Sequence, residues 1–246
     1  NDIKGIVKFV SEKKKKFPKI SLTVRAGGTD MTGGCLSESI IISLTKHFKH
    51  IGKISKNSAV VEPGVYFRDF EKQTLKKGLI FPTYPASKSI CALGGMIANN
   101  SGGEKSIHYG KTLDHVLSLK VVLSDGEEHK FKKLTKKQLN AKKAKKNFEG
   151  KIYRGAYNLL EKNYDLIKKS KPRVSKNSAG YYLWDVWDKK YFDLTKLFVG
   201  SQGTLGIITQ AELNLVKKKN HSRLIICFLK KTKDLTDFVN VVLPFK

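Results

Sequence analysis

The chain is poor in cysteine and has no long apolar run, and each shortage removes a class of protein. Its three cysteines, Cys35, Cys91 and Cys227, show no CxxC or metal-type spacing. We therefore expect free thiols in a reducing compartment and no metal site. No apolar stretch approaches the roughly 20 residues that span a bilayer. The N-terminus lacks both an initiator methionine and a signal-peptide layout. These features predict a piece of a longer, cytoplasmic chain.

Arginine is also scarce, although the chain is strongly basic. The 246 residues carry a formal net charge of +27, yet only five of the 48 basic residues are arginine. Arginine dominates base reading and bidentate phosphate binding, whereas lysine is the usual solvated surface charge. The densest lysine stretch, residues 132–151, has almost no aromatic side chains for stacking bases. The charge favours a lysine-rich surface over an anionic membrane or protein partner, and favours nucleic-acid binding least.

Short helical and strand-like patterns alternate along the chain. Apolar spacing predicts helices over residues 2–13, 66–78, 148–169 and 234–242. Strands are predicted over residues 20–24, 39–44, 58–65, 207–215 and 222–231, with a hairpin around Asp125-Gly126. With 40% apolar residues the chain has enough material for a core. The fold class expected is α+β, with βαβ-type connections early and antiparallel pairing later.

A glycine-rich stretch, VRAGGTDMTGG, runs from Val24 to Gly34 directly after a predicted strand. A dinucleotide fingerprint needs GxGxxG before a helix, but here a strand follows. A Walker loop needs Lys-Ser/Thr after its last glycine, but Gly34-Cys35 stands there. Two readings remain: a plain glycine turn, or a strand–loop–strand unit whose backbone N–H groups converge on an anion.

Two further patches of glycine and small residues favour the ligand. GGMIANNSGG spans Gly94–Gly103, and GSQGTLGIIT spans Gly200–Thr209. Three such patches in one chain are hard to explain as separate turns. Exposed backbone beside amide side chains suits a flat ligand with polar edges.

Five motifs in order resemble a known family. They are VRAGGTDMTGG, VEPGV, GLIFPTYPAS…LGGMIANNSGG…YGKTLDHVLSLKVVLSDG, KNSAGYYL and LFVGSQGTLGIIT. Together they resemble the FAD-binding half of the FAD-linked oxidases. This is the vanillyl-alcohol-oxidase group, and within it the branch of D-lactate dehydrogenases and the glycolate oxidase flavin subunit. The resemblance extends to about Val216 and implies an α+β, two-subdomain, PCMH-type FAD-binding domain. It implies a small subdomain over residues 1–62, a larger one over 63–217 and the start of an α+β cap domain over 218–246.

The resemblance also implies which residues hold FAD. The pyrophosphate would lie on the backbone of Arg25, Ala26, Gly27, Gly28, Thr29, Asp30 and Met31, with Gly33 and Gly34 shaping the exit. The ribityl chain and isoalloxazine would lie along Pro85, Ser87, Gly94, Gly95, Asn99, Asn100, Ser101, Gly102 and Gly103, closed by Tyr109 and Gly110. Gly203, Gly206, Ile207 and Ile208 would lie near the flavin ring or the adenine.

Some residues depart from the family pattern. Ala26 replaces a frequent glycine, which is tolerable if its φ is negative. Asp30 puts a carboxylate beside the expected pyrophosphate, which is repulsive unless the side chain turns away. Gln202 stands where a glutamate is common. Covalently flavinylated relatives carry a histidine in the pyrophosphate loop, and this loop has none. The FAD is therefore expected to be non-covalent.

In this branch a small D-2-hydroxy acid gives hydride to flavin, and a side-chain base takes the hydroxyl proton. The family's carboxylate clamp and base belong to the cap domain, so the catalytic residues of this chain are unknown. Lys176, Asn177 and Tyr181 in KNSAGYYL are candidates for the substrate side. The electron acceptor, a quinone or a protein carrier, and a peripheral membrane association stay open. The alternative function is a flavin-binding module without activity of its own.

Overall fold

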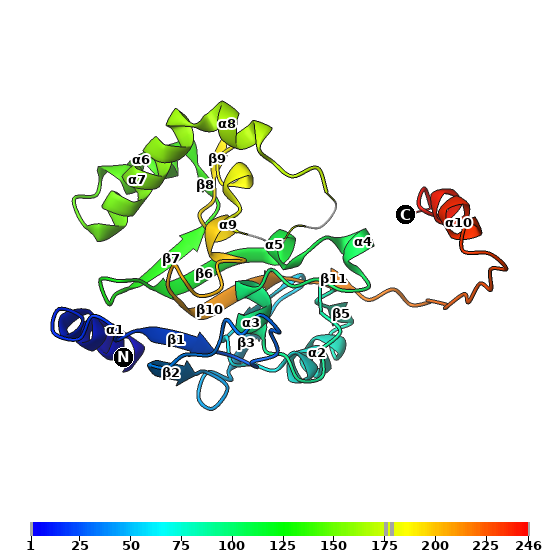
Figure 1. Cartoon of the computed structure of the whole chain (residues 1–246), viewed down its shortest axis with the longest axis horizontal. Coiled ribbons are helices and arrows are strands. Elements are labelled where there is room, and N and C mark those ends of the chain that lie inside the picture. Colours follow the sequence, from blue (N-terminus) through cyan, green and yellow to red (C-terminus); the bar gives the residue numbers. More distant parts are fainter. Residues whose placement is uncertain (1, 175–176, 178–179, 246) are drawn as a thin grey trace.

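The computed structural model describes residues 2–174, 177 and 180–245, and a five-stranded antiparallel sheet forms its centre (Figure 1). The strand order is β3 (Ile51–Ile54), β4 (Ser58–Val61), β10 (Ile207–Asn214), β6 (Val116–Val122) and β7 (Glu128–Lys132). The longest strand, β10, lies in the middle and pairs with both β4 and β6. Strands from distant parts of the chain therefore meet in one sheet.

Smaller units surround this sheet. The N-terminal helix α1 (Asp2–Lys13) precedes a parallel pair, β1 (Leu22–Arg25) and β2 (Ile40–Ser43). The remaining helices are α2 (Phe67–Leu75), α3 (Leu93–Ala98), α4 (Ser106–Tyr109), α5 (Thr112–His115), α6 (Lys136–Ala144), α7 (Phe148–Lys162), α8 (Tyr164–Lys169), α9 (Thr195–Phe198), α10 (Asp234–Val242) and the 3₁₀ turn η1 (Leu183–Asp185). Short antiparallel pairs join β5 (Leu79–Ile80) to β11 (Val216–Lys217) and β8 (Leu134–Thr135) to β9 (Tyr191–Phe192).

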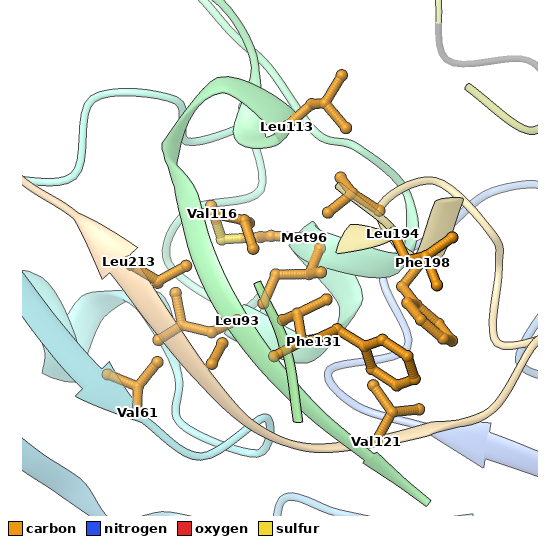
Figure 2. Packing of buried hydrophobic residues seen from close by; sticks show 14 of the residues in the cluster. Val61, Leu93, Met96, Leu113, Val116, Val121, Phe131, Leu194, Phe198 and Leu213 are labelled. Carbon is orange, nitrogen blue, oxygen red and sulfur yellow. The ribbon is translucent and has the colours of Figure 1, made fainter. Parts of the chain in front are cut away.

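Both faces of the sheet are covered. On β6, Val121 belongs to the large core, whereas its neighbour Val122 packs with Ile3 and Leu44 from the N-terminal unit. Successive residues of a strand point to opposite faces, so the two clusters lie on opposite sides. Figure 2 shows part of the large core, where side chains from β4, β6, β7 and β10 meet those of α3, α5 and α9. The N-terminal unit is thereby attached to the sheet by a second, smaller core.

The structure confirms the fold class and most elements. The helix over residues 2–13 is found as predicted, and the Asp125-Gly126 hairpin joins β6 to β7 with Gly126 at φ +71°. The helix expected over residues 148–169 is interrupted at Asn163, where α7 ends and α8 begins. The short strand β3 and the helix α3 were not predicted, because glycine dilutes the apolar pattern in both.

One strand prediction is wrong. Residues 222–231 form no strand; they are an exposed, extended segment between the body and α10 (Figure 1). Its apolar side chains stay in solvent, with Ile225 81% and Phe228 93% exposed. β-branched residues favour a strand only where a neighbouring strand pairs with them. The subdomain boundaries at residues 62 and 217 stay predictions, and β3 and β4, which precede the first boundary, are part of the central sheet.

Candidate functional site

A cavity of about 400 Å³ opens where the loop after β1, the helix α3 and the start of β10 converge. Seven of its 27 lining residues are glycines, more than any other residue type. The lining comprises Val24, Ala26, Gly27, Gly28, Thr29, Asp30, Met31, Gly34, Cys35, Leu44, Pro63, Pro85, Ala86, Ser87, Cys91, Ala92, Gly94, Gly95, Met96, Ala98, Asn99, Ser101, Gln202, Gly203, Gly206, Ile207 and Ile208. All three glycine patches thus reach one cavity.

The loop after β1 lines this cavity and carries backbone donors without an acceptor. Among the described residues, the N–H groups of Gly27, Gly28, Thr29, Asp30 and Met31 have no hydrogen-bond acceptor. Gly27 to Asp30 are half-buried, so their unpaired donors are costly unless water or a ligand accepts from them, whereas Met31 is exposed. Neighbouring backbone N–H groups that lack an acceptor can donate to phosphate oxygens.

Arg25 lies beside these N–H groups. Its guanidinium donates to the Cys35 thiol at 3.3 Å. It also lies next to Gly28, where an added Cβ would come within 2.3 Å of the guanidinium nitrogen Nη2. Gly28 has φ +66°, which L side chains rarely adopt, whereas Ala26 is absent from the positive-φ residues. The alanine is therefore tolerated, as expected, and the loop places one fixed positive charge beside its donors.

The carboxylate of Asp30 is engaged within its own turn. It accepts from the Thr32 hydroxyl and, at 3.4 Å, from the Thr32 backbone N–H. A carboxylate held this way has fewer lone pairs free to face a ligand. Asp30 still lines the cavity and keeps its charge, so its repulsion toward a pyrophosphate stays a prediction.

The lining glycines have two different uses. An added Cβ at Gly27 would lie 2.9 Å from the backbone of Ile90 and Ala92, and one at Gly94 would lie 2.6 Å from Pro63. These two glycines let segments of the protein approach each other. At Gly95 the only atom within 4 Å is the Ala26 Cβ at 3.6 Å, and at Gly203 there is none. Side chains at these two positions would enter open space, so the cavity depends on their being glycine.

Amide side chains form a polar edge of the cavity, beside Gly34 at the end of the loop. Gln202 donates from Nε2 to Asn99 Oδ1 at 2.9 Å, and its backbone N–H donates to Ala98 O at 3.0 Å. Gln202 has φ +55°. These bonds attach the third glycine patch to the end of α3 and hold Gly203 over the cavity.

The structure brings together most of the predicted site residues. Sixteen of them line the cavity: Ala26, Gly27, Gly28, Thr29, Asp30, Met31, Pro85, Ser87, Gly94, Gly95, Asn99, Ser101, Gly203, Gly206, Ile207 and Ile208. Seven do not: Arg25, Gly33, Asn100, Gly102, Gly103, Tyr109 and Gly110. Asn100, for example, is buried, and its Oδ1 accepts from the Leu113 N–H, so it secures α5. The ligand contacts assigned to these residues stay predictions.

Sequence reasoning missed the apolar wall, formed by Val24, Leu44, Pro63, Ala86, Cys91, Ala92, Met96 and Ala98. Such residues look like ordinary core in a sequence, so no signal separates them. Tyr181, a candidate for the substrate side, lies outside the lining and shares a 2.8 Å hydrogen bond with Thr204. Lys176 lies outside the described residues.

Few ionisable groups face the cavity. They are Asp30, Cys35 and Cys91. Burial raises the pKa of the Cys91 thiol, so this cysteine is protonated at neutral pH. Across residues 2–174, 177 and 180–245, no three His, Cys, Asp or Glu side chains gather as around a metal ion. The cavity therefore offers backbone donors, amides and apolar surface.

These properties define a class of protein. A volume of about 400 Å³ lies within the range of small-molecule sites. Free N–H groups at one end suit phosphate, while apolar side chains and amides elsewhere suit a flat ring with polar edges. The fold and the site are those of a protein that binds a phosphate-bearing, ring-containing cofactor.

Comparison with known proteins agrees with this class. A family model described as "FAD binding domain" matches residues 1–132. The glycolate oxidase subunit GlcD of Bacillus subtilis is 29% identical over 93% of this chain and 38% of its own length. The D-2-hydroxyglutarate dehydrogenase of Escherichia coli is 31% identical over 86% of this chain and 21% of its own. The mitochondrial D-lactate dehydrogenase [cytochrome] of Arabidopsis thaliana is 28% identical over 89% of this chain and 30% of its own length.

A solved structure shares the fold. Alkyldihydroxyacetonephosphate synthase matches with a TM-score of 0.53 and 18% identity, over 87% of this chain and 30% of that one. The chain belongs to the FAD-binding domain family of FAD-linked oxidases, in the branch of D-lactate and D-2-hydroxyglutarate dehydrogenases and the glycolate oxidase flavin subunit. Its cofactor is FAD, and the free donors, amides and apolar wall fit that molecule. The chain spans between about a fifth and two fifths of these curated relatives' length.

Proposed function

We propose that this chain is the FAD-binding part of an oxidoreductase that oxidises a small D-2-hydroxy acid and holds FAD without a covalent bond. The observation that carries the proposal is the row of unpaired N–H groups from Gly27 to Met31 in a glycine-lined cavity. The relatives' names supply the substrate class: glycolate, D-lactate or D-2-hydroxyglutarate. A quinone or a protein carrier is proposed as electron acceptor, with peripheral association at a membrane.

Each part of the lining has a proposed task. The N–H groups of Gly27 to Met31 hold the pyrophosphate, and the Arg25 guanidinium beside Gly28 adds positive charge. The open space at Gly95 and Gly203 admits the ribityl chain and the ring. The amides of Asn99 and Gln202 orient polar ring edges. When bound, FAD accepts the hydride of the oxidation.

The non-covalent attachment has its own support. None of the lining residues is a histidine, and the Cys91 thiol, which does line the cavity, is kept protonated by burial. A protonated thiol is a poor nucleophile. Precipitating the FAD-loaded protein with acid should leave the flavin in the supernatant. Flavin that stays with the pellet would overturn the non-covalent part of the proposal.

The cavity itself lacks what oxidation of a hydroxy acid also needs. No lysine, arginine or histidine lines it, so no cation there meets a substrate carboxylate. Asp30 is held by Thr32, the Cys35 thiol accepts from Arg25, and Cys91 is protonated, so none of the three is proposed as the base. These absences, which concern only the lining, favour the alternative that the 246-residue chain binds flavin without turnover of its own.

Anaerobic mixing tests the two functions against each other. FAD-loaded protein is mixed with D-lactate, glycolate and D-2-hydroxyglutarate while the flavin absorbance is followed. We expect slow bleaching or none, because orientation and a base supply several kcal/mol of barrier reduction. Rapid bleaching by one acid would show a complete site in these residues, and Tyr181 and Lys176 would be mutated first. If the flavin of a longer chain bleaches rapidly and that of the 246-residue chain does not, the protein is an oxidoreductase whose catalytic residues lie outside these 246 residues.

A further inference from the structure

A second hollow, which shares no lining residue with the glycine-lined cavity, lies where the end of α2, β5 and β11 meet the β3–β4 turn. We call it the lysine groove. It has a volume of about 530 Å³ and is lined by Ile54, Ser55, Lys56, Lys77, Gly78, Leu79, Lys217, Lys218 and Asn220. Four of these nine residues are lysines, and none is an aspartate or glutamate. The groove belongs to no part of the proposed FAD site.

Backbone hydrogen bonds fix the three segments that carry these lysines. The Lys218 N–H donates to Gly78 O at 2.9 Å, and Lys217 pairs with Leu79 across the β5–β11 ladder. The Leu215 N–H donates to Asn57 O at 2.7 Å, which ties β11 to the turn that bears Lys56. The lysines therefore converge because the fold brings their backbones together, not through chance side-chain positions.

The four ammonium groups also lack acidic partners. In the part of the chain that the structure describes, Lys56, Lys77, Lys217 and Lys218 form no ion pair. Two lysine pairs elsewhere do share a carboxylate: Lys4 and Lys8 share Glu127, and Lys142 and Lys145 share Glu149. Four like charges around one hollow repel each other, and a bound anion relieves that repulsion.

The chemistry of the lining narrows the anion. Lysine binds phosphate as a point charge, and four ammonium groups around one hollow suit an anion that carries several charges, as a phosphate compound does. No aromatic ring is present in this lining to stack a base. The floor consists of Leu79, which is buried, and Ile54, which is half-buried. We propose that the lysine groove binds a phosphate-bearing anion without a base, either a soluble phosphate compound or a phospholipid headgroup.

The test uses the FAD-loaded chain, so that the glycine-lined cavity is filled. Inorganic tripolyphosphate is titrated by calorimetry, and vesicles of phosphatidylglycerol and phosphatidylcholine are tested by co-sedimentation. The groove variant replaces Lys56, Lys77, Lys217 and Lys218 by glutamine. The matched control replaces four exposed lysines outside the groove by glutamine: Lys15, Lys132, Lys137 and Lys151. Both variants therefore lose the same charge. Flavin content and thermal unfolding verify that both variants fold.

We expect the groove variant to bind tripolyphosphate or vesicles at least tenfold more weakly than the parent. The affinity of the control variant should stay within twofold of the parent. Groove-dependent binding of tripolyphosphate without vesicle binding identifies a soluble phosphate ligand. Groove-dependent vesicle binding identifies a lipid headgroup. If neither probe binds, or if the control loses as much affinity as the groove variant, the proposal is wrong and the lysines act only as general surface charge.

Discussion

The two hollows of this protein would bind an anion through different groups. The glycine-lined cavity has seven glycines among 27 lining residues and no lysine or arginine, so it offers fixed backbone dipoles. The lysine groove has four lysines among nine lining residues, so it offers mobile full charges. Fixed dipoles in a half-buried loop are sensitive to shape, whereas exposed ammonium groups are sensitive to salt. Changes of shape should therefore weaken binding in the glycine-lined cavity, and added salt should weaken binding in the lysine groove.

The largest effect is expected from Gly95→Val, which fills the cavity. The added Cβ makes only an ordinary contact with Ala26, so the side chain projects into the space proposed for FAD. We expect a loss of FAD affinity of about 100-fold or more, equal to roughly 2.7 kcal/mol, with Tm nearly unchanged. Flavin fluorescence titration measures it.

The matched control for Gly95→Val is Gly155→Val, because Gly155 on α7 has no atom within 4 Å of its added Cβ. It should bind FAD as the parent does. Tripolyphosphate binding should be unchanged in both variants. If Gly95→Val titrates FAD like the parent, the ring does not pass Gly95.

A second prediction separates backbone strain from ligand approach. Gly28 and Gly78 both have φ +66°, but an added Cβ at Gly28 meets the Arg25 guanidinium, and one at Gly78 meets nothing. Alanine at either position should cost about 1 kcal/mol of stability through its φ, or about 3 °C in Tm. Only Gly28→Ala should also weaken FAD binding, by about tenfold. Equal FAD affinity in the two variants would mean that Gly28 matters for the turn alone.

Salt should distinguish the hollows directly. Between 50 and 300 mM NaCl the tripolyphosphate affinity should fall about fivefold or more, because screening acts on exposed ammonium groups. FAD affinity should change less, by about twofold or under, since its proposed donors are neutral N–H groups with the single charge of Arg25 beside them. Calorimetry at each ionic strength gives both values. A steeper salt dependence for FAD than for tripolyphosphate would reverse the comparison.

An exposed ion-pair cluster outside both hollows should matter least. Glu127 accepts from Lys8 at 2.6 Å and Lys4 at 3.0 Å, and these hydrogen bonds lower its pKa from 4.5 to about 2. A lowered folded-state pKa stabilises α1 above pH 4.5, and this stabilisation is lost as pH falls toward 2. The effect is small because the groups are exposed. The protection of α1 amides against hydrogen exchange, taken relative to intrinsic exchange at each pH, should fall over this range in the parent by more than in Glu127→Gln. Identical pH profiles would show that the pairs contribute nothing.

The sequence predicts the glycine-lined cavity far better than it predicts the lysine groove. Glycine clusters such as Gly27-Gly28 and Gly94-Gly95 are local signals of backbone exposure, so they can be found before any fold is known. The groove lysines stand at positions 56, 77, 217 and 218, and only the β5–β11 pairing brings them together. In a chain with 48 basic residues nothing marks these four.

The same limit explains the errors in the elements. Alternation and hairpin signals gave β6, β7 and β10, because each is a local pattern. The apolar run over residues 222–231 has the composition of a strand, but pairing requires a partner strand, and none lies beside it in the described structure. A sequence shows which residues can be buried, whereas the rest of the fold decides which are.

The central claim is that the N–H groups from Gly27 to Met31 hold the pyrophosphate of FAD. A crystal structure of the FAD-loaded chain tests it most directly. We expect pyrophosphate oxygens within about 3.2 Å of several of these five nitrogens, with the isoalloxazine beyond Gly95. A pyrophosphate that contacts none of them, whether it lies elsewhere in the cavity or in the lysine groove, would contradict it.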